Sequence, residues 1–355
     1  MIPLLKQFPG IAGSLSYISL ADLPTPVQHL KGLERELNRR DVFIKRDDLS
    51  GALYGGNKIR KLEFVLAKAI SEGAVRVITS GAAGSNHCLA VAMYAAQCGL
   101  KADLMLFAQE KSKAVAENLL ADYYCGATIH HDKTYEEHLG STRSIIEYYT
   151  EKDGRAPFII PPGGSSVEGV VGYVNAAFEL RDQISSGEFS CPERIFVALG
   201  TMGTAAGLAL GIKAAGLPCS LAAVRVVPSY VADRKKFFTL LDDTNRLLHD
   251  ADSSFPICQI DESDFFIEDG YLGAGYGIVT KEAQKGIELM SRVDSIKLDG
   301  VYTGKVFAAF LDSVSDERNG GSSLFWNTKN SRALPQEAMK IDYHRLPGEL
   351  HGYFQ

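Results

Sequence analysis

Hydrophobic positions in this chain follow two alternating spacings. Short, continuous apolar runs predict buried strands, and they cover VRVIT at 75–79, ADLMLF at 102–107, PFII at 157–160, RIFVAL at 194–199 and LAAVRVV at 221–227. Longer stretches with helical spacing separate them, at 87–98, 112–125, 167–184, 204–216 and 280–292. Strands that alternate with helices predict parallel sheets covered by helices on both faces. Ligands of such folds bind at the carboxyl ends of the strands.

One further helix is predicted where the sequence GGNKIRKLE begins. Its apolar residues repeat every three or four positions, at Ile59, Leu62, Val65, Leu66, Ala69 and Ile70. Lys58 therefore stands at a helix start. Gly55 and Gly56 permit a tight turn and the close approach of a ligand, and Asn57 adds a short polar side chain. The amine of Lys58 is a candidate for chemistry, although this local pattern alone favours an ordinary surface lysine.

The loop SGAAGSNH joins the strand ending near Thr79 to an apolar helix. Ser85, Asn86 and His87 lie at the start of that helix. Free backbone N–H groups and the Ser85 hydroxyl suit a carboxylate or a phosphate. The alternative is that Ser85 or Asn86 only caps the helix.

A second loop, GTMGTAAG, follows the strand at 194–199 and opens the next helix. Gly200 and Gly203, with the hydroxyls of Thr201 and Thr204, suit an anion. The loop lacks the Gly-Lys-Ser/Thr of a P-loop, and its glycine spacing differs from the dinucleotide-binding fingerprint. A purely structural glycine-rich turn is the alternative.

Two tyrosines late in the chain are flanked by glycines. Tyr276 lies in GAGYG and Tyr302 in DGVYTGK. Such tyrosines suit a substrate pocket, although each alone is more often a packing residue.

Composition narrows the possible functions. A chain of 355 residues with 46% hydrophobic content has a length typical of about two domains. The formal net charge of -6 provides no basic excess for nucleic acid. No apolar run approaches the roughly 20 residues of a membrane span. The N-terminus lacks a signal-peptide pattern, so we expect a cytoplasmic protein. The most linker-like stretch, at 316–323, is short, so the two domains are expected to share an intimate interface.

Cysteine and histidine spacing predicts no metal site. The six cysteines form no C-x-x-C pair and several lie in apolar segments, which is typical of buried free thiols. His130 and His131 are adjacent, so on a strand they would face opposite sides and could not chelate one ion.

The motifs GGNKIRKLE, SGAAGSNH, GTMGTAAG, GYG and VYTGK, in this order, resemble those of pyridoxal-phosphate enzymes of the tryptophan-synthase-β type. More narrowly, they resemble the D-cysteine desulfhydrase and 1-aminocyclopropane-1-carboxylate deaminase family, over residues 20–330. The resemblance implies fold type II, with two doubly wound α/β domains of mostly parallel sheets and pyridoxal 5'-phosphate in the cleft between them. It implies a large cofactor-binding domain (1–62 with 176–355), a small domain (63–175) and a homodimer.

The resemblance also assigns the cofactor residues. Lys58 is implied to form the covalent link to the cofactor, with Asn57 beside it. Lys61 is implied to hold the phosphate, together with the loop Gly200, Thr201, Met202, Gly203 and Thr204. Asn86 corresponds to an asparagine near the phenolic oxygen of the cofactor.

The remaining residues are implied to act on the substrate, a small amino acid. Ser85 corresponds to a serine that contacts the substrate carboxylate or transfers a proton, and Asn86 and His87 lie beside it. Tyr276 and Tyr302 correspond to active-site tyrosines. The candidate catalytic residues are therefore Lys58, Ser85 and Tyr302.

Thr303 discriminates between the two activities of this family. Ring-opening deaminases carry glutamate after the tyrosine, where it faces the pyridine nitrogen, and this chain has Thr303. Without an anionic partner the ring is a weaker electron sink, which favours β-elimination. Thr328 aligns with a threonine that hydrogen-bonds the ring nitrogen in desulfhydrases.

Several positions depart from the family pattern. Gly84 replaces a usual glutamine before SNH, which predicts a changed substrate side of the pocket. Asn327–Asn330 reads N-T-K-N instead of H-T-G-G, Met202 replaces a small residue, and Gly300 replaces a frequent proline. The chain is therefore expected to be a divergent member with its own amino-acid substrate.

The leading functional hypothesis is a pyridoxal-phosphate-dependent lyase that releases pyruvate and ammonia from a β-substituted amino acid, like D-cysteine desulfhydrase. One alternative is 1-aminocyclopropane-1-carboxylate deaminase, which forms 2-oxobutyrate and ammonia. Another is a non-catalytic protein that binds the cofactor, suggested by Gly84 and Lys329. A nucleotide-binding α/β protein in which Lys58 is incidental is the remaining hypothesis.

Overall fold

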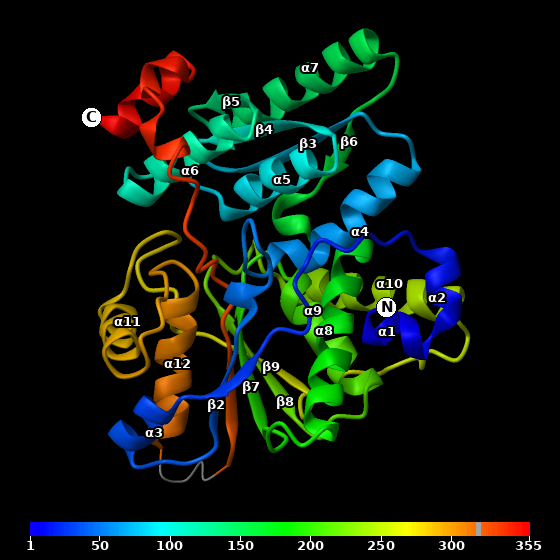
Figure 1. Cartoon of the computed structure of the whole chain (residues 1–355), viewed down its shortest axis with the longest axis vertical. Coiled ribbons are helices and arrows are strands. Elements are labelled where there is room, and N and C mark those ends of the chain that lie inside the picture. The colour runs from blue at the N-terminus through cyan, green and yellow to red at the C-terminus, as the bar shows by residue number, and fades with distance from the viewer. Residues whose placement is uncertain (317–320) are drawn as a thin grey trace.

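Two sheets organise the chain, as the computed structural model shows for residues 1–316 and 321–355 (Figure 1). Part of the expected linker, residues 317–320, lies outside the described residues. The larger sheet has the order β1-β2-β10-β7-β8-β9, formed by Val27–His29, Val42–Lys45, Ser323–Trp326, Arg194–Leu199, Ser220–Arg225 and Phe265–Glu268. The smaller has the order β5-β4-β3-β6, formed by Thr128–Asp132, Lys101–Phe107, Arg76–Ala82 and Phe158–Ile160. Within the described residues, every strand pair except β1–β2 is parallel.

Helices cover both faces of the larger sheet (Figure 1). On one side lie α8, α9 and α10, which span Val167–Ser185, Gly203–Ala214 and Arg234–Ala251, with the short α1 (Pro3–Gln7) and α2 (Pro9–Ser14) beside them. On the other side lie α3, α11 and α12, which span Lys31–Leu37, Lys281–Asp294 and Thr303–Ser315.

The smaller sheet is covered in the same way. Helices α5 (Asn86–Gln97) and α6 (Lys113–Tyr124) lie on the side toward α4 (Lys58–Ser71), and α7 (Tyr135–Asp153) lies on the opposite side (Figure 1). The architecture confirms the predicted α/β fold with mostly parallel sheets covered on both faces.

Residues of the larger sheet alternate between two hydrophobic clusters. Phe43 and Val197 pack with α8 and α9, whereas Ile44 and Phe196 pack with α12. Successive side chains of a strand point to opposite faces, so burial of both faces requires apolar residues at every position. This explains why the central strands read as unbroken apolar runs.

The predicted elements agree with the structure to within a few residues. Missed elements include β2 and β10, which have only four residues each, and helices α7, α10 and α12. Ile70 was assigned to the buried stripe of α4 but is 41% exposed, because it lies in the last turn of that helix. All six cysteines are free, but only Cys88 and Cys219 are buried and the other four are half-buried.

The expected domain division stays a prediction. Strands β3 to β6 all come from residues 76–160, and the expected boundaries at 62/63 and 175/176 fall inside α4 and α8. None of the helices in the described ranges is both long enough and apolar enough to cross a membrane.

A buried network of charges ties β2, α4 and α8 together. Lys45 Nζ lies 2.7 Å from Glu179 Oε1, and Arg60 Nη2 lies 2.9 Å from the same oxygen and 2.7 Å from Asp47 Oδ1. Asp47 belongs to the 3-10 turn η1 (Asp47–Leu49) and also accepts hydrogen bonds from Tyr173 and Trp326. Opposite charges and hydrogen bonds compensate the loss of hydration of these buried groups.

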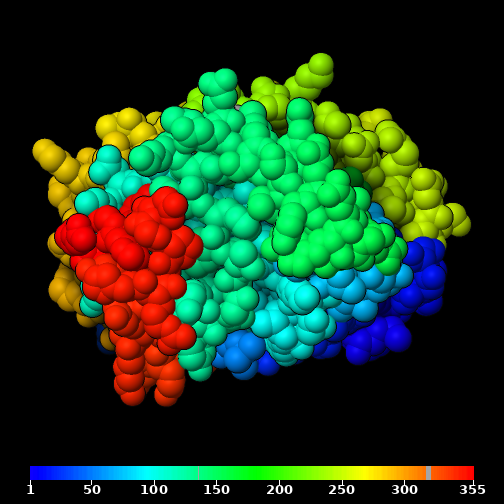
Figure 2. Space-filling model, turned by 90° about the horizontal axis from the view of Figure 1, so that it is seen from above, coloured from blue at the N-terminus to red at the C-terminus, as the bar shows by residue number. Residues whose placement is uncertain are grey.

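The last 25 residues cross from the larger sheet to the smaller one. They follow β10 and form three 3-10 turns, η3 (Ala338–Lys340), η4 (Tyr343–Arg345) and η5 (Gly348–Phe354), that lie beside α6. Figure 2 shows this segment, in red, on the surface next to the teal and green residues of the smaller sheet's helices.

Candidate active site

A cavity of about 410 Å³ lies between the two sheets, at the carboxyl ends of β3 and β7. Most of the residues that the sequence singled out line it: Asn57, Lys58, Lys61, Ser85, Asn86, His87, Gly200, Thr201, Met202, Thr204, Tyr276, Tyr302 and Thr328. They come from six separate stretches of the chain. The fold therefore gathers motifs that are up to 271 positions apart, from Asn57 to Thr328.

Lys58 is the first residue of α4 and its side chain lines the cavity. Burial disfavours the ammonium form and lowers the pKa of Lys58 from 10.5 to about 8. A substantial fraction of the amine is then neutral near physiological pH, which a nucleophilic lysine requires.

Lys61, one turn further along α4, is fully buried in a polar cradle. Its Nζ donates to the carbonyl of Gly163 at 3.1 Å and to Ser165 Oγ at 3.3 Å. Burial, and then the charge of Lys58, lowers the pKa of Lys61 well below its usual value. No described carboxylate forms a salt bridge with this amine, so a bound anion would restore the charged form.

The start of α9 forms the other side of this cradle. The hydroxyls of Ser165 and Thr201 are 2.9 Å apart, and the Gly203 N–H lies 3.3 Å from Ser165 Oγ. A Cβ at Gly203 would lie 3.0 Å from Lys61 Nζ and 2.7 Å from Ser165 Oγ, so only glycine leaves this space open. Gly203 itself does not line the cavity. Hydroxyls, a helix N-terminus and a buried cation together suit a phosphate.

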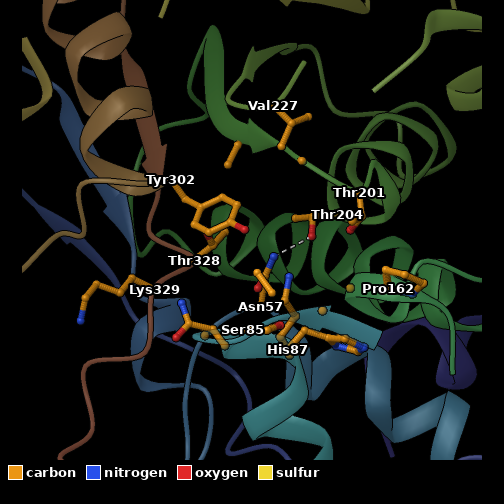
Figure 3. Close-up of a pocket in the computed structure, with 18 of the residues that line it drawn as sticks. Asn57, Ser85, His87, Pro162, Thr201, Thr204, Val227, Tyr302, Thr328 and Lys329 are labelled. Carbon is orange, nitrogen blue, oxygen red and sulfur yellow. Dashed lines mark hydrogen bonds between the residues drawn. The ribbon is translucent and has the colours of Figure 1, made fainter. Parts of the chain in front are cut away.

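The turn before α9 is tight. Met202 has φ of 69°, in the left-handed region that side chains other than glycine rarely adopt. Thr204 in the first turn of α9 accepts a hydrogen bond of 3.0 Å from Asn57 Nδ2, shown as the dashed line in Figure 3. This bond joins the lysine motif directly to the glycine-rich loop.

Ser85 and Asn86 stand at the start of α5. Ser85 is the N-cap, and its Oγ accepts from the Cys88 N–H at 3.2 Å, as the capping alternative expects. Its hydroxyl nevertheless faces the cavity, so capping and ligand binding are compatible. Asn86 Oδ1 accepts from Tyr54 and Asn118 at 3.0 and 3.1 Å, which orients the Nδ2 group of Asn86 as a donor.

His87 is a buried, neutral imidazole. Its Nε2 lies 2.9 Å from the Thr79 hydroxyl, which donates its own proton to the Ile160 carbonyl, so Nε2 carries the hydrogen. Burial, and then the nearby Lys58 and Lys61, lowers the pKa of His87 well below its usual value. The residue therefore adds no charge to the cavity wall.

Tyr302 lies across the cavity from Ser85 and His87 (Figure 3). Its hydroxyl is 2.5 Å from that of Tyr276. Burial raises the pKa of both phenols, so both stay protonated at neutral pH. The pair can donate a hydrogen bond or a proton to a ligand.

Thr303 is not brought into the cavity. It is buried at the start of α12, where its hydroxyl donates to Asp299 Oδ2 at 2.7 Å. Asp299 does line the cavity, but its oxygens accept bonds from Thr303 and from the backbone N–H groups of Val301 and Tyr302. Thr328, by contrast, lines the cavity near Tyr302 (Figure 3). This side of the cavity is therefore lined by Asp299 and Thr328 and not by Thr303.

Gly84 also lies outside the cavity lining, contrary to the expectation that it alters the substrate side. A Cβ at Gly84 would meet Val115 Cγ2 at 2.7 Å, on α6, so the residue faces the interior of the smaller sheet's domain. Lys329 does line the cavity, but Figure 3 shows it pointing away from the other labelled residues. Its Nζ donates to the Asn330 carbonyl at 2.8 Å.

Sequence reasoning missed the third loop of the cradle. Pro162–Gly164 forms the 3-10 turn η2 and precedes α8, and Gly163 and Ser165 contact Lys61. The segment PPGGSSVEG has the same signature as the two loops that were found, with a strand, then small residues, then a helix. Tyr54, which orients Asn86, carried no sequence signal that we can identify.

The fold and the cavity place a lysine of lowered pKa beside a polar cradle that suits an anion. Comparison with known proteins specifies the class. The model of the family described as "Pyridoxal-phosphate dependent enzyme" matches residues 18–328. This chain belongs to that family, and pyridoxal phosphate is its cofactor.

Relatives with similar sequence identity to this chain carry two different names. A protein of Pyrococcus abyssi, provisionally named 1-aminocyclopropane-1-carboxylate deaminase, is 35% identical over 329 residues, with 92% of each chain covered. The D-cysteine desulfhydrase of Salmonella paratyphi B is 33% identical over 332 residues, with 89% of this chain and 94% of that protein covered. The chain thus belongs to the group of these two enzymes, and the comparison does not choose between them.

Solved structures agree with the fold. The crystal structure of a 1-aminocyclopropane-1-carboxylate deaminase homologue superposes with a TM-score of 0.78, at 30% identity and with 99% of each chain covered. A pyridoxal 5'-phosphate-dependent aspartate racemase, at 15% identity and a TM-score of 0.58, shares the fold.

Proposed function

We propose that this enzyme is a lyase of the D-cysteine desulfhydrase kind, which eliminates the β substituent of a small amino acid to give pyruvate and ammonia. The observation that carries the proposal concerns the side of the cavity near Tyr302. There the lining offers the neutral hydroxyl of Thr328, while the carboxylate of Asp299 is engaged by the first residues of α12. A cofactor ring with a neutral partner favours early loss of a good leaving group.

Pyridoxal phosphate supplies an electron sink for the bond that breaks at the α-carbon of the substrate. The residues proposed to hold its phosphate are Lys61, Ser165 and Thr201, with the N-terminus of α9. Their geometry fits a dianion because a buried cation, two hydroxyls and a helix start converge on the space beside Gly203.

The amino-acid substrate is proposed to bind between Ser85 and Tyr302. The oxygen of Ser85 accepts the Cys88 N–H, so its proton can be donated to the substrate carboxylate, alongside the free N–H groups at the start of α5. Lys58, once the amino acid has displaced it, is the base on its own face of the cofactor, because its lowered pKa leaves part of the amine neutral near neutral pH. On the opposite face, Ser85 or the hydroxyl pair of Tyr302 and Tyr276 transfers the proton.

The test is a product assay with the purified holoenzyme. Pyruvate is expected from D-cysteine, β-chloro-D-alanine, L-cysteate or a related β-substituted amino acid, and the Lys58→Ala variant should release none. Formation of 2-oxobutyrate from 1-aminocyclopropane-1-carboxylate without pyruvate from the others would establish the deaminase instead. If no amino acid changes the absorbance of the bound cofactor, the protein is a non-catalytic binder.

The cofactor contacts are tested separately. Borohydride reduction followed by peptide mapping should place a pyridoxyl adduct on Lys58. Loss of a charge-assisted hydrogen bond in Lys61→Met should weaken pyridoxal phosphate binding by roughly 10- to 100-fold. Lys68→Met is the matched control on the same helix, because Lys68 forms an ion pair with Glu168 away from the cavity. Equal cofactor affinity in the two variants would exclude Lys61 from the phosphate site.

A further inference from the structure

The C-terminal segment, residues 331–355, packs behind the loop that carries Ser85. The segment follows Asn330, which lines the cavity. Near the start of the segment, Arg332 donates a hydrogen bond to the Gly51 carbonyl at 3.0 Å. The segment then runs up to the smaller sheet and ends against α6 (Figure 1). It is the last part of the chain to join that half of the molecule.

Apolar side chains of the segment belong to the core directly beneath the loop. Leu346 and Leu350 are 3% and 0% exposed and share one hydrophobic cluster with Ala83 and Cys88. Ala83 and Cys88 flank the stretch Gly84–His87, which includes Ser85 and Asn86. The back of the substrate loop therefore rests in part on the C-terminal segment.

Hydrogen bonds extend this support to the backbone of the loop. The Tyr353 hydroxyl accepts the Gln109 N–H at 3.1 Å and lies 3.2 Å from His131 Nε2. Gln109 in turn accepts the Gly84 N–H through its Oε1 at 3.0 Å. On the other side of the same residue, Asn118 donates to the Gly84 carbonyl at 2.9 Å and to Asn86 Oδ1 at 3.1 Å.

Gly84 makes the loop dependent on these neighbours. Val115 Cγ2 lies 2.7 Å from the place of its missing Cβ, so no side chain at this position can anchor the loop. Its N–H and carbonyl are instead held by two side chains from outside the loop, Gln109 and Asn118. The next two residues are those proposed to bind the substrate carboxylate and the cofactor.

We propose that Tyr353 and Gln109 are positioning residues, which hold the Gly84–Asn86 backbone in the geometry that receives the substrate carboxylate. Tyr353 fixes the backbone of Gln109, and the Gln109 side chain fixes Gly84 immediately before Ser85. The C-terminal segment is thus part of the support of the active site. This inference rests on the proposed function for its effect on the substrate, but the ordering of the loop is measurable without any substrate.

Amide hydrogen exchange of the holoenzyme tests the ordering. Loss of one hydrogen bond in Tyr353→Phe or Gln109→Leu should speed exchange of residues 83–87 by about three- to tenfold. Gln109→Glu retains an acceptor oxygen and should restore the protection. Tyr343→Phe is the matched control on the same segment, since its ring stacks on Phe354 and its hydroxyl has no hydrogen-bond partner within residues 1–316 and 321–355. Identical exchange at 83–87 in the Tyr353 and Tyr343 variants would overturn the proposal.

The second measurement separates positioning from general stability. In Tyr353→Phe the KM for the amino acid should rise about three- to tenfold, while cofactor affinity and the absorbance of the Lys58-linked cofactor stay as in Tyr343→Phe. An equal loss of cofactor and activity would show that the segment only stabilises the fold, and would refute the proposal. If native enzyme responds to no amino acid, the proposed function fails, and the exchange measurement still decides whether Tyr353 orders the loop.

Discussion

Lys58 and Lys61 lie one turn apart on the same helix but have different surroundings. The side chain of Lys58 lines the cavity. The amine of Lys61 instead donates hydrogen bonds to the Gly163 carbonyl and to Ser165. Burial lowers the pKa of both amines, and the charge of Lys58 lowers the pKa of Lys61 further. A bound anion in contact with Lys61 would raise the pKa of Lys61 again. The helix thus presents one amine suited to reaction and one suited to holding charge.

The pKa of Lys58 makes the proposed attachment of the cofactor to this residue depend on pH. Attachment to an aldehyde requires the neutral amine, and with a pKa of about 8 roughly a tenth is neutral at pH 7 and roughly nine tenths at pH 9. The rate at which apoenzyme attaches pyridoxal phosphate should therefore rise about ninefold from pH 7 to pH 9. Stopped-flow absorbance measures this rate, with Lys58→Ala as the blank. A rate that is flat over this range would contradict a lowered pKa.

The sequence predicted which residues line the cavity better than it predicted their orientations. Lys58 and Ser85 line it, and they were predicted to because a helix start with small residues before it is a local feature that a few adjacent positions specify. The family resemblance associated Thr303 and Gly84 with the cavity, but Thr303 donates to Asp299 at the start of α12 and Gly84 faces Val115. Such orientations depend on contacts between distant segments, which the local pattern does not contain.

At the scale of elements, three loop-to-helix junctions build the proposed phosphate side of the site. The starts of α4, α8 and α9 meet around Lys61, where Ser165 precedes α8 and Gly203 begins α9. Each junction leaves N–H groups without partners inside its own helix, and the helix dipole adds partial positive charge. The closeness of these elements explains why a side chain at Gly203 has no room.

Gly203→Ala tests this close approach. The added methyl would lie 3.0 Å from Lys61 Nζ and 2.7 Å from Ser165 Oγ, so it should displace the cradle and weaken pyridoxal phosphate binding by roughly tenfold or more. Titration of the apoenzyme with the cofactor measures the effect. Gly140→Ala on α7 is the control, because no atom lies within 4 Å of its Cβ position. Unchanged affinity in Gly203→Ala would mean that the phosphate binds elsewhere.

Element prediction succeeded for most of the longer apolar runs, and for the three-residue β6 within PFII. Strands β7 and β8 have six residues each and were found, whereas β2 and β10 have four and were missed. A four-residue segment such as VFIK becomes a strand because its two neighbours in the sheet supply the hydrogen bonds. Those neighbours are distant in sequence, so the local signal is weak.

At the scale of the whole molecule, the buried charges of Lys45, Arg60, Asp47 and Glu179 hold the lysine helix against the larger sheet. Glu179→Gln removes one carboxylate and leaves two buried cations without full compensation. The free energy of unfolding should fall by about 3–5 kcal/mol, as measured by urea denaturation. Glu36→Gln, in the exposed pair with Arg292, is the control and should change stability little. Similar effects of the two substitutions would contradict a structural role for the buried network.

The pKa of Glu179 predicts how the stability of the fold changes in acid. Nearby Arg60 and Lys45 outweigh burial and lower the pKa of Glu179 from 4.5 to about 2. The native state therefore holds this proton more weakly than the unfolded chain. Its stabilising contribution is complete above pH 4.5 and is lost as the pH falls toward 2.

The position of β10 has a consequence for synthesis on the ribosome. This strand is formed by Ser323–Trp326 and lies between β2 and β7, in the interior of the larger sheet. The smaller sheet is complete once residue 160 has emerged, so it can form while the chain is still being translated. The larger sheet cannot be completed before residues 323–326 have emerged, and the segment proposed to support the substrate loop follows them in the chain. The proposed site between the two sheets is therefore assembled only after the smaller sheet can form.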